Sequence, residues 1–221
     1  YEQSLDSSTR RHGGVHYTPY EVAKRLARIT LSELPFGPIC DPSVGGGAFL
    51  LAAAEYLSEK GVSPKKIIGE YLWGIDLDQG AIEVAKASIS IWGSTKVWIP
   101  VNEHFAVANS LQSGMRSFLR PPKRGFIAVI GNPPFQNQLQ ETTVRPIEET
   151  QKLREKWNVN AGPYADTASY FLLVALSMLS PKGKCLLIQP QSILASVDAK
   201  PIRDKLNQEA TLEGIWIGGA D

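Results

Sequence analysis

The sequence predicts an α/β protein with a doubly wound, mostly parallel β-sheet. Short apolar runs alternate with segments in which apolar residues recur at helical spacing, a pattern typical of a parallel sheet covered by helices. The first four apolar runs each end in polar residues or glycine. A length of 221 residues, with 43% hydrophobic and 20% charged residues, fits one main globular domain with a sizeable core. Because open α/β sheets bind ligands beyond the carboxyl ends of their strands, we expect the functional site at these four ends.

Four strands are expected before residue 131. They cover residues 38–40, 67–75, 104–108 and 126–130, and they lead to Asp41, Asp76, Asn109 and Gly131, respectively. Helices are predicted after the first two strands, where apolar residues recur at helical spacing: Phe49, Leu50, Ala53, Ala54 and Leu57 after the first, and Ile82, Ala85 and Ile89 after the second. Asp78 is placed to cap the second of these helices.

The second half of the chain is spaced differently. Residues 136–162 form a polar stretch with balanced charge, which is too long for a plain connector and indicates a functional loop with a helix over residues 147–157. An apolar helix is predicted over residues 165–179, closed by a turn at residues 180–183. Buried strands are expected at residues 185–188 and 214–217.

The overall charge gives no reason to expect nucleic-acid binding by bulk electrostatics. Lys and Arg number 23 against 22 Asp and Glu, a formal net charge of +1. This balance still allows a local basic groove, and one cluster of basic residues has no acid between its members: Arg116, Arg120, Lys123 and Arg124. A solvated loop is the simpler interpretation of that cluster.

The two cysteines, Cys40 and Cys185, lie far apart within apolar runs. They give neither a disulfide framework nor the spacing of metal ligands, so we expect two core residues, no metal and the reducing setting of the cytoplasm. No apolar stretch reaches the ~20 residues of a membrane span, and the first residues lack the apolar core of a secretory signal.

A glycine-rich loop follows the first strand. Gly45, Gly46 and Gly47 are contiguous between a strand and a helix, where the backbone must turn tightly and approach a ligand closely. The loop is of the nucleotide-binding type, although it matches neither the dinucleotide fingerprint nor a P-loop. The alternative is a turn whose glycines only let the helix and strand pack. Asp76 ends the second strand, where its carboxylate can accept two hydrogen bonds from ribose hydroxyls.

Two other positions have an interpretation that needs no ligand. Asn109 ends the third strand, where its amide can bond the edge of an adenine ring or serve a turn. Residues 18–21, Thr-Pro-Tyr-Glu, match a complete capping box with proline at the first helical position. The helix that they open is expected to present Val22, Leu26 and Ile29 on one face. The capping box leaves the preceding His16 and Tyr17 unexplained.

The tetrapeptide Asn132-Pro133-Pro134-Phe135 directly follows the fourth strand. Its prolines remove two backbone donors, so the Asn132 side-chain oxygen and the Pro133 carbonyl are left as acceptors. Such a pair suits an amino group on a planar base. Accepting both hydrogens draws the nitrogen toward tetrahedral geometry and frees its lone pair, while Phe135 can stack on the base for about 1–3 kcal/mol. A plain Pro-Pro turn is the alternative.

In their order along the chain, these motifs resemble the catalytic domain of amino-group DNA methyltransferases that modify adenine at N6 in bacterial restriction–modification systems. The resemblance covers residues 16–192 and implies the Rossmann-like fold of S-adenosylmethionine-dependent methyltransferases. It implies a catalytic motif of Asn132, Pro133, Pro134 and Phe135. The cofactor-binding residues that it implies are His16, Tyr17, Thr18, Pro19, Asp41, Pro42, Ser43, Gly45, Gly47, Phe49, Asp76, Leu77, Asn109, Ser110 and Asn132.

The resemblance also implies how the chain is organised and what it acts on. Residues 1–35 are expected to form a helical segment that contacts the cofactor, and residues 36–221 a catalytic domain that is incomplete at its end and lacks the target-recognition region. The expected reaction is direct methyl transfer to N6 of an adenine flipped out of the duplex. Expected partners are DNA, a target-recognition domain and a nuclease domain or subunit, with no membrane.

The chain departs from the family pattern at two places, and three other functions fit the same motifs. The family often has Gly-Asp where this chain has Ala108-Asn109, and the chain ends soon after Trp216, before the family's later aromatic motif. Methylation of a protein glutamine amide or of an RNA guanine amine would need similar hydrogen bonding. A non-catalytic module that binds S-adenosylmethionine or DNA within a larger assembly is a candidate from a different class.

Overall fold

The computed structural model describes residues 18–93, 101–135 and 147–218, and it contains a five-stranded sheet in the order β3-β2-β1-β4-β5. The strands are β1 Ile39–Asp41, β2 Leu72–Asp76, β3 Phe105–Val107, β4 Phe126–Gly131 and β5 Leu179–Leu187. All four neighbouring pairs are parallel. The predicted α/β class and parallel sheet are therefore confirmed.

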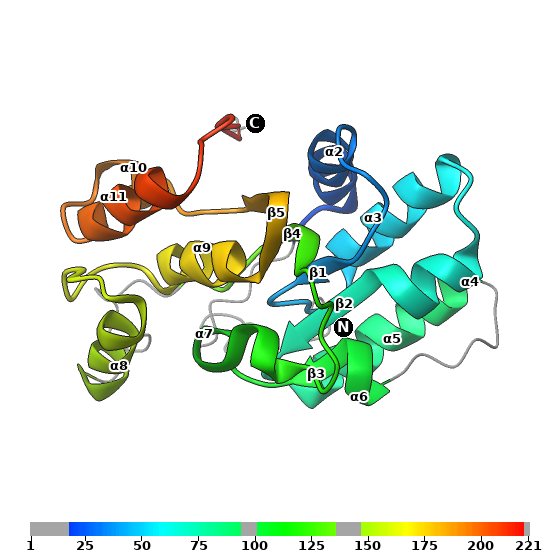
Figure 1. Ribbon diagram of the computed structural model, residues 1–221, viewed down its shortest axis with the longest axis horizontal. Helices are drawn as coiled ribbons and strands as arrows, with labels where there is room; N and C mark the ends of the chain where they lie inside the picture. The colour runs from blue at the N-terminus through cyan, green and yellow to red at the C-terminus, as the bar shows by residue number, and fades with distance from the viewer. Residues whose placement is uncertain (1–17, 94–100, 136–146, 219–221) are drawn as a thin grey trace.

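Helices cover both sides of this sheet, with α2, α3 and α5 on one side and α8, α9 and α11 on the other (Figure 1). The helical segments are α2 Tyr20–Leu31, α3 Ala48–Glu59, α4 Pro64–Lys66, the π-helix η2 Ile67–Tyr71, α5 Gln79–Trp92, α6 Val101–His104, α7 Ser110–Ser113, the 3₁₀-helix η3 Gly114–Ser117, α8 Ile147–Trp157, α9 Thr167–Met178, α10 Ser192–Ala195 and α11 Lys200–Glu209. In the described ranges, none of these helices has the length and apolar content that crossing a membrane requires.

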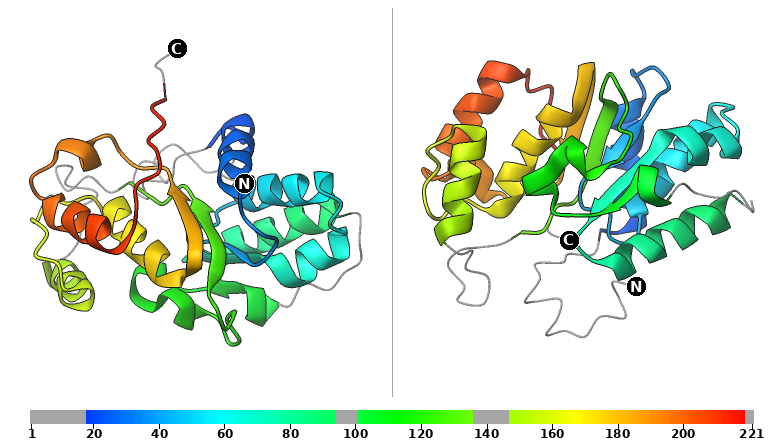
Figure 2. Two further views of the ribbon diagram at one scale, coloured as in Figure 1. Left: turned by 45° about the horizontal axis from the view of Figure 1, so that its top comes forward. Right: turned by 60° about the horizontal axis from the view of Figure 1, so that its bottom comes forward.

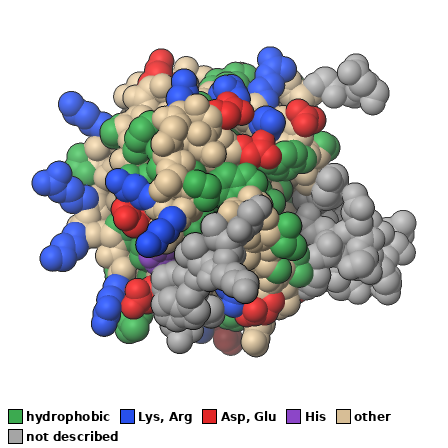
Figure 3. All heavy atoms as spheres, turned by 90° about the vertical axis from the view of Figure 1, so that its right-hand side faces the viewer, with side chains coloured by type: hydrophobic (Ala, Val, Ile, Leu, Met, Phe, Trp, Pro, Cys, Tyr) green, Lys and Arg blue, Asp and Glu red, His purple; other side chains and the backbone are tan. Residues whose placement is uncertain are grey.

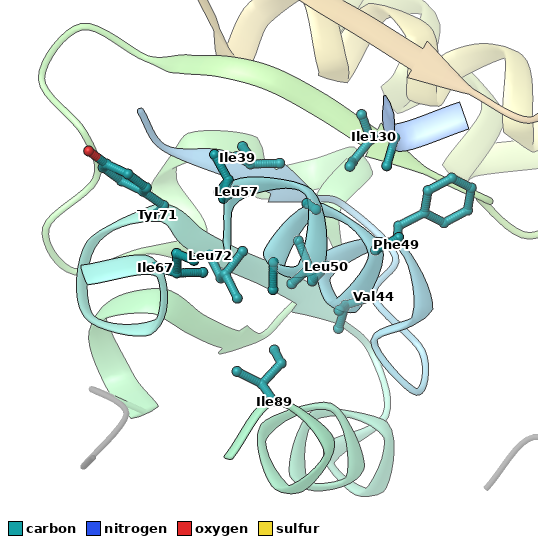
Figure 4. Packing of buried hydrophobic residues seen from close by; sticks show 14 of the residues in the cluster. Ile39, Val44, Phe49, Leu50, Leu57, Ile67, Tyr71, Leu72, Ile89 and Ile130 are labelled. Carbon is teal, nitrogen blue, oxygen red and sulfur yellow. The ribbon is translucent and has the colours of Figure 1, made fainter. Parts of the chain in front are cut away.

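Each face of the sheet has its own hydrophobic core, because successive strand residues point to opposite faces. Ile39 of β1 belongs to the core under α3, whereas its neighbour Cys40 belongs to the core under α9. Figure 4 shows Leu50 and Leu57 of α3 lying over Ile39 and Leu72 of the sheet. The sheet and its helices thereby form a rigid support for the loops at the strand ends.

Helix α2 packs on α3 through a different face from the one that we expected. It buries Ala23, Ala27 and Leu31, whereas Val22 is 43% exposed. Small alanines allow α2 to approach α3 closely, which a face of larger side chains would prevent. Ion pairs between Lys24 and Glu55 (2.9 Å), and between Arg28 and Glu59, flank this contact. On the face of the molecule in Figure 3, basic and acidic side chains lie side by side in this manner.

The second predicted strand is half as long as expected. Residues 67–71 form the π-helix η2, and only Leu72–Asp76 is extended. Ile67, Ile68 and Tyr71 of η2 are buried in the core. Periodicity alone does not separate a buried helical turn from a buried strand when the apolar run is short.

The end of the sheet also differs from the prediction. The expected turn at residues 180–183 lies inside β5 as a bulge: between the pairs Phe126–Leu179 and Ala128–Lys184, β5 inserts extra residues, and Lys182 adopts a φ of 65°. As an edge strand, β5 is half-buried rather than buried. A bulge absorbs such an insertion by bending the strand locally.

The strand predicted at residues 214–217 is absent. These residues are irregular, and Ile215 and Trp216 are 53% and 54% exposed. Glu213 still contacts the sheet through an ion pair with Lys184 of β5 (2.8 Å), and toward its end the chain extends away from the body of the protein (Figure 2, left). An apolar run becomes a strand only where its backbone pairs with a neighbouring strand, and residues 214–217 pair with no strand in the described ranges.

Both cysteines are free thiols that pack with the core under α9, as expected. Cys40 is fully buried, and Cys185 is half-buried on the edge strand. Burial raises the pKa of Cys40 well above its ordinary value and that of Cys185 to about 12. Because the thiolate is the reactive form, both side chains are inert at neutral pH.

Trp73 and His104 stack near the amino-terminal ends of β2 and β3, with ring centroids 3.7 Å apart. Phe118 and Phe126 contact the same indole edge-on. Burial in this aromatic cluster lowers the pKa of His104 from 6.5 to about 4, against the opposing effects of Glu103 and of a hydrogen bond to the backbone of Leu72. The folded protein therefore holds this imidazole neutral.

The depressed pKa of His104 predicts a loss of stability in mild acid. Above pH 6.5 the imidazole is neutral in both states, and as the pH falls toward 4 only the unfolded chain takes up the proton. We expect the free energy of unfolding to fall by about 2 kcal/mol more between pH 7.5 and pH 5 in the wild type than in His104→Gln. Urea titrations at the two pH values measure this difference; equal losses in both proteins would show that His104 is not the titrating group.

Candidate active site at the strand ends

The pairing of β1 with β4 creates the switch point of the sheet. The chain leaves β1 toward α3 on one face and leaves β4 toward α9 on the other. Ile39 pairs with Ala128 and Cys40 with Val129, so the carboxyl ends of these two strands lie side by side. Ligands of open α/β sheets bind at such a point. Two of the predicted site motifs, the glycine loop and the Asn-Pro-Pro-Phe turn, begin there.

Asp41 connects these two motifs. Its side chain is 2% exposed, and its Oδ1 accepts a hydrogen bond from the Ser43 backbone N–H at 2.9 Å. On the other side it lies against Gly131 so closely that a methyl group on that Cα would overlap Oδ1 and lie 3.0 Å from Cγ. Glycine at 131 is therefore required by the neighbouring strand, a constraint that the sequence does not signal.

The glycines of the loop have different reasons to be there. Gly45 and Gly47 adopt φ angles of 49° and 88°, a region that disfavours side chains, and a Cβ on Gly47 would lie 3.3 Å from Ala85 of α5. Gly46 has neither constraint, since an added Cβ would meet only Val84 at 4.0 Å. The fold therefore requires glycine at 45 and 47, whereas at Gly46 it leaves room for a Cβ.

Asp76 ties the end of β2 to the glycine loop. Its Oδ2 accepts a hydrogen bond from Gly45 N–H at 2.9 Å, and its Oδ1 accepts one from Asp78 N–H at 3.0 Å. Burial raises the pKa of this carboxyl, and the backbone bonds oppose that effect. The backbone of Leu77 also bonds this carboxylate, and with about four lone-pair positions Asp76 can still accept a hydrogen bond from a ribose. The neighbouring Leu77 is 70% exposed.

Asp78 caps α5, as the sequence predicts. Its side chain accepts a hydrogen bond from Gly80 N–H at 2.7 Å. Asn109 serves the turn role that the sequence left open, because it caps α7 through a bond from Leu111 N–H at 3.0 Å. The Asn109 side chain is therefore oriented by the start of α7.

Ser110 and Lys156 hold α7 in place at its two ends. The Ser110 hydroxyl is buried and donates to the Pro42 carbonyl, which joins α7 to the glycine loop. Lys156 of α8 donates to the carbonyls of Leu111 at 2.6 Å and Gln112 at 2.8 Å. Burial, and the nearby Arg116, lower the pKa of this ammonium group. No signal in the sequence predicts this contact, because it joins elements that only the fold brings together.

Asn132 is placed at the end of β4 and is held by the start of α2. Its Nδ2 donates to Thr18 Oγ1 at 2.9 Å. The predicted capping box is wrong: Pro19 is the N-cap of α2, which begins at Tyr20 and has no side-chain cap bond. After Asn132, Pro133 is buried, and Pro134 and Phe135 are half-buried. His16 and Tyr17 lie outside the described residues.

The residues at this point fit S-adenosylmethionine. Asp76 offers carboxylate lone pairs, and Gly46 leaves room for close approach. Ser43 Oγ is shielded from solvent and has no hydrogen-bond partner in the described part of the chain. A polar ligand can provide that partner. Phe49 is buried under the loop in the hydrophobic core. In the ranges that the structure describes, no group of three His, Cys, Asp or Glu side chains is arranged to hold a metal ion.

This sheet order, with a glycine loop after β1, an acid after β2 and Asn-Pro-Pro-Phe after β4, is the Rossmann-like arrangement seen in S-adenosylmethionine-dependent methyltransferases. The model of one family, N-6 DNA Methylase, matches residues 1–217. The chain therefore belongs to the N-6 DNA methylase family.

The chain is also similar to individual proteins and solved structures. The Type II methyltransferase M.VspI of Vibrio sp. (strain 343) is 25% identical over 187 residues, which cover 83% of this chain and 38% of that protein. Among solved structures, the DrdV–DNA complex matches 94% of this chain and 23% of that chain, with a TM-score of 0.70 and 18% identity. The M protein of the type I restriction enzyme EcoKI matches 92% and 38%, with a TM-score of 0.62 and 19% identity. The chain thus spans well under half the length of these relatives.

The contact between Asp41 and Gly131 generates a testable prediction. In Gly131→Ala the new methyl group overlaps the Asp41 carboxylate, so the end of β4 must shift, at a cost of about 1–3 kcal/mol in the free energy of unfolding. Gly69→Ala is the matched control, because no atom lies within 4 Å of a Cβ there. Urea denaturation measures both variants. A Gly131→Ala protein as stable as the Gly69→Ala protein would contradict the close contact.

Proposed function

We propose that this chain is the catalytic part of an enzyme that transfers a methyl group from S-adenosylmethionine to N6 of adenine in DNA, within a restriction–modification or phage-defence system. The observation that carries the proposal is the position of Asn132-Pro133-Pro134-Phe135 at the end of β4, directly beside Asp41 and the glycine loop. Family membership supports the reaction class.

Residues 41–47 and Asp76 would hold the cofactor, with the start of α7 beside them. S-adenosylmethionine would supply a methyl group bonded to a sulfonium. As the amine nitrogen bonds this methyl group, the sulfur would depart as a neutral thioether, and the nitrogen would take the positive charge and then lose one proton to solvent. Asp76 would accept hydrogen bonds from the ribose, and Gly46 would admit the ligand against the backbone. Ser110 keeps α7 against the loop through the Pro42 carbonyl. Thr18 and Pro19 lie at the start of α2, beside Asn132.

Asn132 and Pro133 would act on the substrate amine. With its Nδ2 bonded to Thr18, Asn132 can direct Oδ1 to one amine hydrogen, and the Pro133 carbonyl can accept the other. Two acceptors fixed before the reaction favour the nitrogen geometry in which the lone pair is free to attack. Phe135 would stack on the base after it has left the duplex. Catalysis would then consist mostly of orientation and hydrogen bonding.

The organisation of the whole protein is part of the proposal. We assign residues 1–35 to a helical segment that contacts the cofactor and residues 36–221 to the catalytic domain. DNA is the proposed partner, since the structural neighbours include DrdV, solved as a complex with DNA, and the Type IIL restriction–modification enzyme MmeI, also solved with DNA. A target-recognition domain and a nuclease domain or subunit are the further proposed partners, and the cytoplasm is the proposed location.

Two other functions remain as outcomes of the test. Methylation of a protein glutamine amide or of an RNA guanine amine uses the same pair of acceptors. A non-catalytic module would bind S-adenosylmethionine or DNA without transferring the methyl group. Neither has an observation in its favour that the adenine enzyme lacks.

The proposal predicts that methyl transfer and cofactor binding separate at Asn132. We expect the full-length protein to transfer label from S-adenosylmethionine to unmethylated DNA, and Asn132→Ala to lose at least about 100-fold in rate while its Kd for the cofactor changes less than about threefold. Filter-bound radioactivity measures transfer, and calorimetry measures binding. Label that appears only in protein or RNA of a cell extract would point to the other substrates, and binding without transfer would favour the non-catalytic module.

A further inference from the structure

Thr18 is buried beside Asn132 for a reason that helix capping does not explain. Its side chain is 7% exposed, and its hydroxyl accepts the 2.9 Å hydrogen bond from Asn132 Nδ2. The first turn of α2 is closed by bonds from Val22 and Ala23 to the Pro19 carbonyl, with no side-chain cap. Alanines of α2 hold the helix against α3, so the position of Thr18 is set by packing within the core.

The bond matters because a carboxamide has two unlike ends. Its nitrogen only donates hydrogen bonds, and its oxygen only accepts them. A substrate amine that donates two hydrogen bonds must meet the oxygen of the Asn132 carboxamide. A rotation of 180° about the Cβ–Cγ bond would instead place the Asn132 N–H groups against the amine N–H groups. Because a threonine hydroxyl can also donate, the direction of the observed bond, in which Nδ2 is the donor, is what selects the orientation. Thr18 Oγ1 is the acceptor, and it lies far from Asn132 in the sequence.

We infer that Thr18 is a positioning residue, which fixes the orientation of the Asn132 amide so that Oδ1 faces the reacting amine. The inference rests on the proposed function, because only a substrate that donates hydrogens requires this orientation. It differs from a role for Thr18 as a cofactor contact, which would act on cofactor affinity. Two kinds of measurement therefore distinguish the roles.

Thr18→Val is the direct test, because valine has nearly the shape of threonine and lacks the acceptor. With valine in place, the active orientation loses this acceptor for Nδ2, and we expect kcat at saturating cofactor to fall roughly 10- to 100-fold. Thr18→Ser retains the hydroxyl and is expected to stay within about threefold of the wild type. The Kd for S-adenosylmethionine is expected to change less than about threefold in both variants.

Comparing the effect of Thr18→Val in the wild type and in Asn132→Asp tests the orientation role separately. In Asn132→Asp the carboxylate has an acceptor oxygen on each side, so orientation no longer matters. We expect Thr18→Val to lower kcat less than about threefold in that background. An equal loss in both backgrounds would show that Thr18 acts through the general structure of the site, and the inference would be wrong.

A readout that needs no activity is the side-chain amide signal of Asn132. In protein labelled with ¹⁵N-asparagine, the signal is assigned by its absence from Asn132→Ala. We expect hydrogen exchange of these amide protons to be at least about tenfold faster in Thr18→Val than in the wild type and in Thr18→Ser. Equal exchange in the wild type and Thr18→Val would overturn the inference.

The outcomes separate the inference from the proposed function. A wild-type protein that transfers no methyl group to DNA contradicts the proposed function, while the exchange measurement still decides whether Thr18 holds the amide. A Thr18→Val protein with weaker cofactor binding and unchanged kcat makes Thr18 a cofactor contact and overturns the inference. Should Thr18→Val fold poorly, Thr18→Ala replaces it in the same comparisons, with the same expected loss.

Discussion

The parallel pairing of β1 with β4 is the constraint on which the site depends. It brings the end of β1 against the end of β4, although the two strands are far apart in the chain. Asp41 can then lie against Gly131, and the glycine loop and the Asn-Pro-Pro-Phe turn become neighbours. The two hydrophobic cores on either face keep these strands in register. The contacts of Asp41 with Gly131 depend directly on this arrangement.

Most polar side chains at the strand ends hold the protein's own backbone. Asp76 bridges the glycine loop and the start of α5, Asn109 caps α7, and Ser110 bonds the Pro42 carbonyl. Such bonds fix the site before any ligand arrives, which lowers the ordering that binding would otherwise require. They also explain why one residue can look structural and functional at once. A carboxylate with four lone-pair positions serves both purposes, whereas a buried amide must be oriented by a neighbour.

The sequence predicts the local parts of this structure well and the long-range contacts poorly. Helix α8 was expected over residues 147–157 and is observed at Ile147–Trp157, because its pattern and flanks are local signals. Residues 67–71 and 214–217 were expected as strands and are not, since an apolar run extends only where a neighbouring strand is available. The contacts of Thr18 with Asn132 and of Lys156 with α7 leave no local trace. Thr18, which was predicted to cap α2, instead accepts a hydrogen bond from Asn132.

The chemical identity of the methylated nucleoside shows whether the protein methylates adenine at N6 in DNA. Unmethylated DNA is incubated with the full-length protein and S-adenosylmethionine that carries a deuterated methyl group, then digested to nucleosides for mass spectrometry. The account predicts that the deuterated methyl group is found in N6-methyladenine. Its appearance in N4-methylcytosine or 5-methylcytosine instead, or in no nucleoside at all, would contradict the proposed reaction.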